Sequence, residues 1–161
     1  MEASSHGLLQ ARLNGLDFKT AIFTNFSQDH LDYHKNMKDY LKAKLILFSK
    51  LLKEKNKIVT DNKIKEFPKL KLIAKNRKLN LLTIGTENST IKINSLTNKN
   101  NFQQLSFRHN NKKYTITVPL IGFFQIKNLL MAILAAEHSG LNINTIVKSI
   151  KKIKEVNGRL Q

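Results

Sequence analysis

Cysteine is absent from the 161 residues, which excludes disulfides, thiolate nucleophiles and cysteine metal ligands. No run of about 20 apolar residues occurs, so a membrane-spanning helix is not expected. The N-terminus, Met1 to His6, lacks the basic and apolar regions of a secretory signal. We therefore expect a cytoplasmic protein with one domain, because this length suffices to bury one core.

Acidic residues are also few, with 11 against 28 lysines and arginines, and the net charge is +17. Such a charge is typical of proteins that bind nucleic acid or a membrane surface. However, only four of the basic residues are arginines, the residue type that usually reads nucleic acid through paired hydrogen bonds. The lysines are spread along the chain, from Lys19 to Lys154. We interpret the charge as a general lysine and asparagine bias that would still attract an anionic substrate.

Short apolar or alternating runs predict strands in the first and second halves of the chain. These runs are residues 21–24, 57–60, 81–85, 91–94, 104–107 and 114–118. The last three alternate between apolar and polar side chains, which favours an antiparallel subsheet with one wet face. Asn110 and Asn111 lie between two of these runs and are typical of a hairpin turn.

Helical spacing of apolar residues is clearest over residues 36–52. Lys44 falls within that otherwise apolar face, and its simplest interpretation is a snorkelling side chain. Further helices are expected over 62–78, over 126–139 with Gly140 as a stop, and from Asn142 or Asn144 to about 153. The pattern as a whole predicts a mixed α/β fold with a β-rich insertion in its second half.

Two segments are dense in chemically capable side chains. Residues 1–12 offer a carboxylate, hydroxyls, an imidazole and a guanidinium, a set that can hold a metal or a phosphorylated ligand. Residues 24–34 include two aspartates and two histidines, and a metal site there is conceivable. A frayed polar N-terminus and a structural polar cluster are the alternatives for these two segments.

Taken together, these segments resemble the Mur ligase family, in particular its UDP-N-acetylmuramoyl-tripeptide synthetases. That family shows Met-Glu-x-Ser-Ser-His, Gln-x-Arg, Phe-Thr-Asn-x-Ser-x-Asp-His-Leu-Asp-Tyr-His and Tyr-x-x-Ala-Lys. The same pieces follow here in the same order, at residues 1–6, 10–12, 23–34 and 40–44. Weaker matches are Gly122 to Asn128, against Gly-x-Phe-Asn-x-x-Asn, and Gly158-Arg159 near the end. Gln125 departs from the pattern, because the family has asparagine there.

The resemblance implies an α/β fold: a partial Mur ligase central domain, P-loop-type and Rossmann-like, with a small antiparallel β subsheet. Residues 1–161 would form a truncated ATP-binding central domain. The implied reaction transfers the ATP γ-phosphate to a carboxylate, after which an amine attacks the acyl phosphate. In this branch of the family the reaction adds the third amino acid, meso-diaminopimelate, to UDP-MurNAc-L-Ala-D-Glu during peptidoglycan synthesis. ATP and Mg²⁺ are the implied cofactors.

The resemblance also assigns roles to single residues near magnesium. Glu2 and His30 would be magnesium ligands, and His30 would take part in catalysis. Lys44 would be carbamylated, because a neutral lysine amine adds carbon dioxide and becomes an anion that supports magnesium. This role would account for a lysine on an apolar helix face, where burial favours the neutral amine.

Substrate and nucleotide contacts are implied in the same way. Ser4, Gln10 and Arg12 would bind the UDP-muramoyl substrate, with Arg12 pairing with an anionic group. Asn128 and Arg159 would bind ATP.

The Gly-rich phosphate loop of the family, of the type G-x-x-x-x-G-K-[ST], does not occur in these 161 residues. The resemblance implies that this loop, its strand, the N-terminal UDP-binding domain and the C-terminal amino-acid-binding domain are absent. We therefore expect a chain that is inactive alone, exposes an apolar strand edge and works with a companion chain if it works at all. The alternative is a basic nucleic-acid-binding module derived from the ligase, without catalysis.

Overall fold

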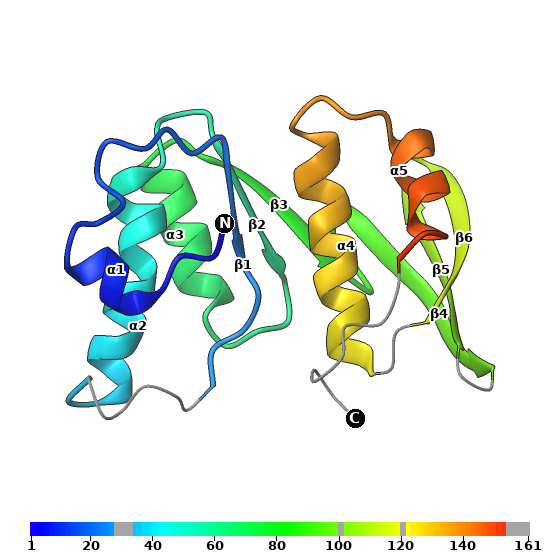
Figure 1. Ribbon diagram of the computed structural model, residues 1–161, viewed down its shortest axis with the longest axis horizontal. Coiled ribbons are helices and arrows are strands. Elements are labelled where there is room, and N and C mark those ends of the chain that lie inside the picture. Colours follow the sequence, from blue (N-terminus) through cyan, green and yellow to red (C-terminus); the bar gives the residue numbers. More distant parts are fainter. Residues whose placement is uncertain (28–33, 100–101, 120–121, 154–161) are drawn as a thin grey trace.

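The protein is described by a computed structural model over residues 1–27, 34–99, 102–119 and 122–153. One six-stranded sheet, in the order β1-β2-β3-β4-β5-β6, carries helices on both faces (Figure 1). The strands are β1 (Thr20–Phe23), β2 (Lys57–Asp61), β3 (Asn80–Gly85), β4 (Ile91–Lys99), β5 (Phe102–His109) and β6 (Lys112–Val118). The helices are α1 (Ser5–Leu9), α2 (Met37–Ile46), α3 (Phe67–Asn76), α4 (Phe123–Glu137) and α5 (Ile143–Ile150), with a π-helical turn η1 (Leu47–Leu51).

The sheet changes its strand direction part-way across. Strands β1, β2 and β3 are parallel, and β3 pairs with β4 in parallel over only two residue pairs, Ile84 with Ile91 and Gly85 with Lys92. Strands β4, β5 and β6 form two antiparallel pairs, which confirms the predicted subsheet. Asn110 and Asn111 have φ of 48° and 62° in the turn between β5 and β6, as predicted for a hairpin.

Two apolar cores lie on opposite faces of the sheet. Ile58 and Val59 are both fully buried, but Ile58 packs with α1, α2, η1 and α3, whereas Val59 packs with α4 and α5. This alternation is what a strand covered on both faces requires. The core under α4 and α5 continues across β4, β5 and β6. The mixed α/β class predicted from the sequence is therefore confirmed.

Several helix boundaries differ from the sequence expectation. The helix predicted over 36–52 becomes a π-helical turn after Ile46, where the Leu52 N–H donates to the Leu47 carbonyl at 3.0 Å. Helix α3 begins at Phe67 rather than at residue 62, and Pro68 occupies its first turn, where a missing N–H costs nothing. Asn142 caps α5 through its Oδ1, which accepts from the Asn144 N–H at 2.9 Å.

Helices of the described ranges are all too short or too polar to cross a membrane.

Candidate active site

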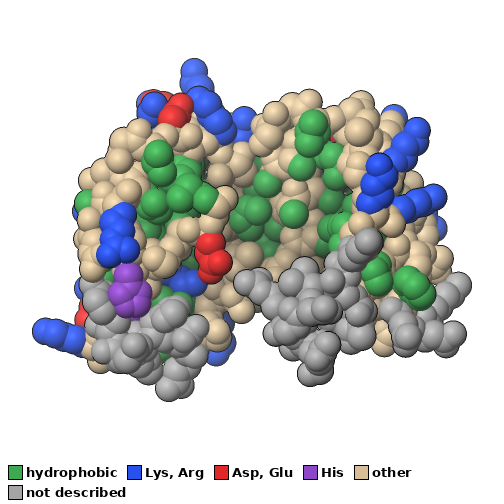
Figure 2. Space-filling model, in the orientation of Figure 1, with side chains coloured by type: hydrophobic (Ala, Val, Ile, Leu, Met, Phe, Trp, Pro, Cys, Tyr) green, Lys and Arg blue, Asp and Glu red, His purple; other side chains and the backbone are tan. Residues whose placement is uncertain are grey.

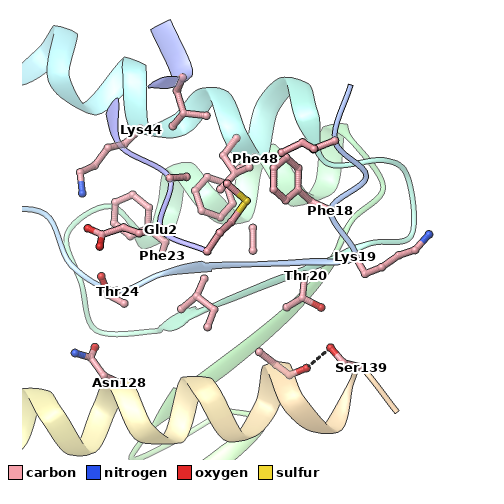
Figure 3. A pocket seen from close by; sticks show the side chains of 18 of the residues that line it. Glu2, Phe18, Lys19, Thr20, Phe23, Thr24, Lys44, Phe48, Asn128 and Ser139 are labelled. Atoms are coloured by element: carbon pink, nitrogen blue, oxygen red, sulfur yellow. Dashed lines mark hydrogen bonds between the residues drawn. The ribbon is translucent and has the colours of Figure 1, made fainter. Parts of the chain in front are cut away.

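A groove with a cavity of about 1100 Å³ runs along the edge of the sheet beside β1 (Figure 3). Its floor is the strand with its flanks, from Phe18 to Asn25. One wall comes from α2 and η1, and the other comes from α4 and the turn that follows it. The wall residues are Lys44, Leu47 and Phe48 on the first side, and Asn128, Ala135, Ala136 and Ser139 on the second. The crease between these layers is visible in Figure 2, where apolar side chains gather.

Polar side chains gather at one end of this groove. Glu2, Lys44, Thr24 and Asn128 lie around the carboxyl end of β1, whereas Lys19 and Ser139 lie at the other end (Figure 3). In open α/β sheets, ligands bind beyond the carboxyl ends of the strands. The arrangement therefore has the position and the chemistry of a binding site for a charged ligand.

Lys44 is placed in the groove by the periodicity of α2. Its neighbour Ala43 is fully buried and Tyr40 is 3% exposed, so this helix face packs on the core as the sequence predicted. The Lys44 Nζ lies 5.3 Å from the centre of the Tyr40 ring, a distance at which a cation interacts with a ring face. The stem is thus half-buried while the terminal nitrogen reaches the groove.

Glu2 is held by the helix that follows it. The Ser4 Oγ accepts from the Gly7 N–H at 3.1 Å and so caps α1. The Ser5 Oγ, which is buried, lies 2.8 Å from the His34 Nε2, and the His34 ring stacks on Tyr40 with centroids 4.9 Å apart. These contacts tie α1 to α2, which fixes the short segment that brings Glu2 opposite Lys44.

Asn128 comes from the other layer, and the residue before it has a buried partner. The Lys127 Nζ lies 2.5 Å from the Asp61 Oδ2, and Asp61 is 2% exposed at the carboxyl end of β2. Lys127 also lies over the Phe123 ring at 4.7 Å. Sequence reasoning missed this pair, although an aspartate at the end of an expected buried strand was a usable clue.

The sequence-predicted site residues divide into three groups. Glu2, Lys44 and Asn128 meet at the groove. Ser4, Gln10 and Arg12 do not line it, since Ser4 caps α1 and the other two are exposed beyond that helix. His30 and Arg159 lie outside the described residues.

The donor atoms at the polar end suit magnesium better than a transition metal. Within the described ranges there is no group of three or more His, Asp or Glu side chains that could hold a metal. Glu2 supplies one carboxylate, Thr24 supplies a hydroxyl at the same end of the groove, and the Asn25 Oδ1 accepts from that hydroxyl at 3.3 Å. Magnesium usually takes one or two carboxylates and completes its shell with phosphates and water. The residues present therefore fit a magnesium–phosphate complex.

Comparison with known proteins then assigns the family, because the sequence pattern of the Mur ligase middle domain matches residues 1–136. The chain belongs to the Mur ligase middle domain family. It is 38% identical to a Rickettsia conorii UDP-N-acetylmuramoyl-L-alanyl-D-glutamate–2,6-diaminopimelate ligase, over 99% of this chain and 33% of the relative. The Agrobacterium fabrum ligase of the same name is 32% identical, over 100% of this chain and 33% of that protein.

Solved structures of Mur ligases share the fold. One structure of a UDP-N-acetylmuramoyl-L-alanyl-D-glutamate–2,6-diaminopimelate ligase superposes with a TM-score of 0.88 at 31% identity, covering 99% of this chain and 33% of that one. The MurF ligase of Thermotoga maritima, solved in complex with ADP, gives 0.77 at 15% identity, covering 98% and 35%. The chain thus spans about a third of the length of the Mur ligases it matches.

Proposed function

We propose that this chain forms the central, ATP-handling part of a ligase that joins meso-diaminopimelate to UDP-MurNAc-L-Ala-D-Glu. The observation that carries the proposal is the meeting of Glu2, Lys44 and Asn128, from three separate segments, at the carboxyl end of β1. Relatives at 38% identity bear the name of that ligase. The proposed location is the cytoplasm, where ATP and the nucleotide-linked precursor are available.

The chemistry explains why these side chains are useful. A carboxylate becomes an amide when its oxygen takes the γ-phosphate of ATP and ADP leaves. An amine then attacks the acyl carbon and loses a proton as phosphate leaves. Negative charge crowds the oxygens of both partners in that first step, so catalysis depends on positioned cations. Magnesium, when bound, supplies that neutralising charge.

Each residue has a distinct part in the proposal. Glu2 would hold the metal through its carboxylate. Lys44 would do so in its carbamylated form, which replaces the ammonium charge with an anion aimed into the groove. Asn128 would orient the nucleotide, because its amide both donates and accepts hydrogen bonds. The remaining roles are those expected from the family pattern. Magnesium would be bound by His30, the UDP-muramoyl substrate by Ser4, Gln10 and Arg12, and ATP by Arg159.

We further propose that the 161-residue chain has no ligase activity alone. Its sequence holds no Gly-rich loop to bind the β- and γ-phosphates through backbone N–H groups. A companion chain with such a loop would restore activity.

A graft tests the proposed function directly. Residues 1–161 would replace the matched third of the Rickettsia conorii ligase, and diaminopimelate-dependent ADP release would be measured. We expect the graft to be active, and Glu2→Gln or Lys44→Ala to lower kcat by about 10²–10³-fold, the usual effect of removing one electrostatic group. Lys42→Ala, on the exposed side of the same helix, is the matched control. A folded graft whose activity is unchanged by Glu2→Gln and Lys44→Ala would refute the assignment.

A further inference from the structure

The positive charge of the chain is concentrated around α3. Residues 50–78 hold eleven lysines and arginines against three acidic residues, so less than a fifth of the chain carries +8 of the net charge of +17. Five lysines of α3 and the turn before it are exposed: Lys63, Lys65, Lys69, Lys71 and Lys75. A general lysine bias accounts for the charge elsewhere but not for this concentration.

The exposed lysines around α3 have no carboxylate partners, unlike other lysines of the same half of the chain. Asp17 forms ion pairs with Lys19 and Lys53, at 2.9 Å and 3.2 Å. Glu54 forms one with Lys78 at 3.1 Å. Among the described residues, no ion pair involves any of the five exposed lysines. Their charge is therefore available to an external anion.

The stability of the helix itself does not explain this placement. Lys69 lies in the first turn of α3, which contains no acidic residue, although a helix N-terminus favours anions. Lys71 and Lys75 are one turn apart, a spacing at which like charges destabilise a helix. Glutamate at some of these positions would stabilise α3. The lysines therefore suit an external partner better than they suit the helix.

An exposed leucine lies among these lysines. Helix α3 packs on the core through Leu70 and Ala74, which are 0% and 4% exposed. Leu72 lies on the opposite side, because two residues correspond to about 200° of helical rotation, and it is 59% exposed. Lys69 and Lys75 flank it at a spacing of three residues, which brings neighbours together on a helix surface. The outward side of α3 is thus basic with an apolar centre.

We propose that this basic face, formed by Lys65, Lys69, Lys71, Leu72 and Lys75, docks on the surface of a bilayer that contains anionic lipids. Lysines on an amphipathic helix are attracted to anionic headgroups, and each strengthens binding roughly fivefold. Leu72 enters the headgroup region between them, as apolar side chains of interfacial helices do. The cytoplasmic surface of a cell membrane carries the complementary negative charge.

Docking through α3 is compatible with an open groove. Helix α3 lies in the layer of α1 and α2, on the opposite side of the sheet from α4 and α5 (Figure 1). No residue of α3 lines the groove beside β1. The lining of the groove therefore stays uncovered when the basic face is on a membrane, so this inference goes beyond the proposed function and does not depend on it.

The side chains of the basic face favour a bilayer over nucleic acid. They include no aromatic ring on which a base could stack. They also include no arginine, and the next arginine in the sequence, Arg77, donates to the Leu52 carbonyl at 2.7 Å. A convex helix with an exposed leucine lacks the groove that follows a single strand.

A tryptophan reporter tests the proposal directly, because the chain contains no tryptophan of its own. The whole chain with Leu72→Trp is titrated with phosphatidylcholine vesicles that contain about 30% phosphatidylglycerol, an anionic lipid. We expect the fluorescence maximum to shift to shorter wavelength with these vesicles and not with phosphatidylcholine alone. Leu141→Trp is the matched control and should not shift, because Leu141 is 56% exposed but lies between α4 and α5.

Two sets of lysine substitutions separate the basic face from the general charge. The first variant carries Lys65→Gln, Lys69→Gln, Lys71→Gln and Lys75→Gln. The control carries the same change in net charge at exposed positions on β6 and around α5: Lys112→Gln, Lys113→Gln, Lys148→Gln and Lys151→Gln. At physiological salt, binding to the anionic vesicles should weaken at least about thirtyfold in the first variant and less than about threefold in the control. Circular dichroism checks that both are folded, and the Leu72→Trp result stands without them.

Three results would overturn the proposal. One is a Leu72→Trp fluorescence maximum that is unchanged at millimolar anionic lipid. Another is equal weakening in the two sets of lysine variants, which would make vesicle binding a property of the net charge alone. The third is an RNA oligonucleotide that binds the parent chain and not the first variant, while vesicle binding is the same in both, which would make nucleic acid the partner. No nucleotide substrate is present in the vesicle experiments, so a failure of the ligase assignment would leave their outcomes unchanged.

Discussion

Lys127 Nζ lies 2.5 Å from Asp61 Oδ2 and joins the first turns of α4 to the carboxyl end of β2. Asp61 is buried, and its other oxygen, Oδ1, accepts from the Lys63 N–H at 2.8 Å. No hydrogen bond to Oδ2 is found among the described residues, so the charge of Lys127 is what offsets the burial of that oxygen.

We predict that Lys127→Met lowers the free energy of unfolding by about 1–3 kcal/mol, because a buried acceptor loses its partner. Asp61→Asn should cost less, since its amide oxygen still accepts from Lys63 and Lys127 can turn to solvent. Urea denaturation measures both, with the exposed Lys148→Met as a control expected within about 0.5 kcal/mol of the parent. Equal losses for Lys127→Met and Lys148→Met would show that the pair adds no stability.

Lys44 should carry a carbamate in bicarbonate buffer. We predict a carbamate resonance in ¹³C NMR after equilibration with ¹³C-bicarbonate, lost in Lys44→Ala and retained in Lys42→Ala. Lys42 is 68% exposed and lies 3.7 Å from the Asp39 carboxylate, so it has no comparable half-buried setting. A resonance that survives Lys44→Ala would place the modification on another of the many lysines.

Gly85 should not tolerate alanine. A Cβ there would overlap the Asn62 side chain, whose amide donates to the Glu87 carbonyl at 2.8 Å and holds the turn between β3 and β4. We predict that Gly85→Ala costs about 1–3 kcal/mol of unfolding free energy, as overpacking does. In an Asn62→Ala background the same change should cost clearly less, because the obstructing side chain is gone. Thermal and urea denaturation of the parent, the two single variants and the double variant completes the cycle.

The pKa of the Asp17 carboxyl should lie below its ordinary value. Lys19 and then Lys53 hydrogen-bond its carboxylate, at 2.9 Å and 3.2 Å, and lower its pKa from 3.8. A depressed folded-state pKa gives stability that is present above pH 3.8 and lost as the pH falls through the lower value. Carboxyl ¹³C titration should show a higher Asp17 pKa in Lys19→Met than in the parent, and a smaller rise in Lys53→Met. High salt should also raise the Asp17 pKa of the parent, because it screens both lysines. An unchanged pKa in Lys19→Met would contradict this account.

Much of the fold was predictable because it depends on local periodicity. The alternating runs predicted β4, β5 and β6, and the pair Asn110-Asn111 predicted the turn between β5 and β6. The π-helical turn η1 was not predictable from the same information, because a spacing of 3.6 residues does not distinguish an α-helical end from a wider turn. The two-pair junction between β3 and β4 depends on a loop held by Asn62, which has no sequence signature.

The site was predictable in part, and from motif order rather than from periodicity. The sequence motifs predicted three site residues that the fold brings to one groove: Glu2, Lys44 and Asn128. The sequence does not predict the contact between Asp61 and Lys127, because contacts between distant segments depend on the sheet topology.

The change of strand direction at β4 has a consequence for how the chain folds. The antiparallel strands after it join neighbours along the chain, and hairpins of this kind form within about 1–10 μs. The parallel strands before it meet only after long loops close, and such contacts form slowly. We therefore expect the second half of the sheet to order first and to serve as the surface on which α4, and then the groove beside β1, is assembled.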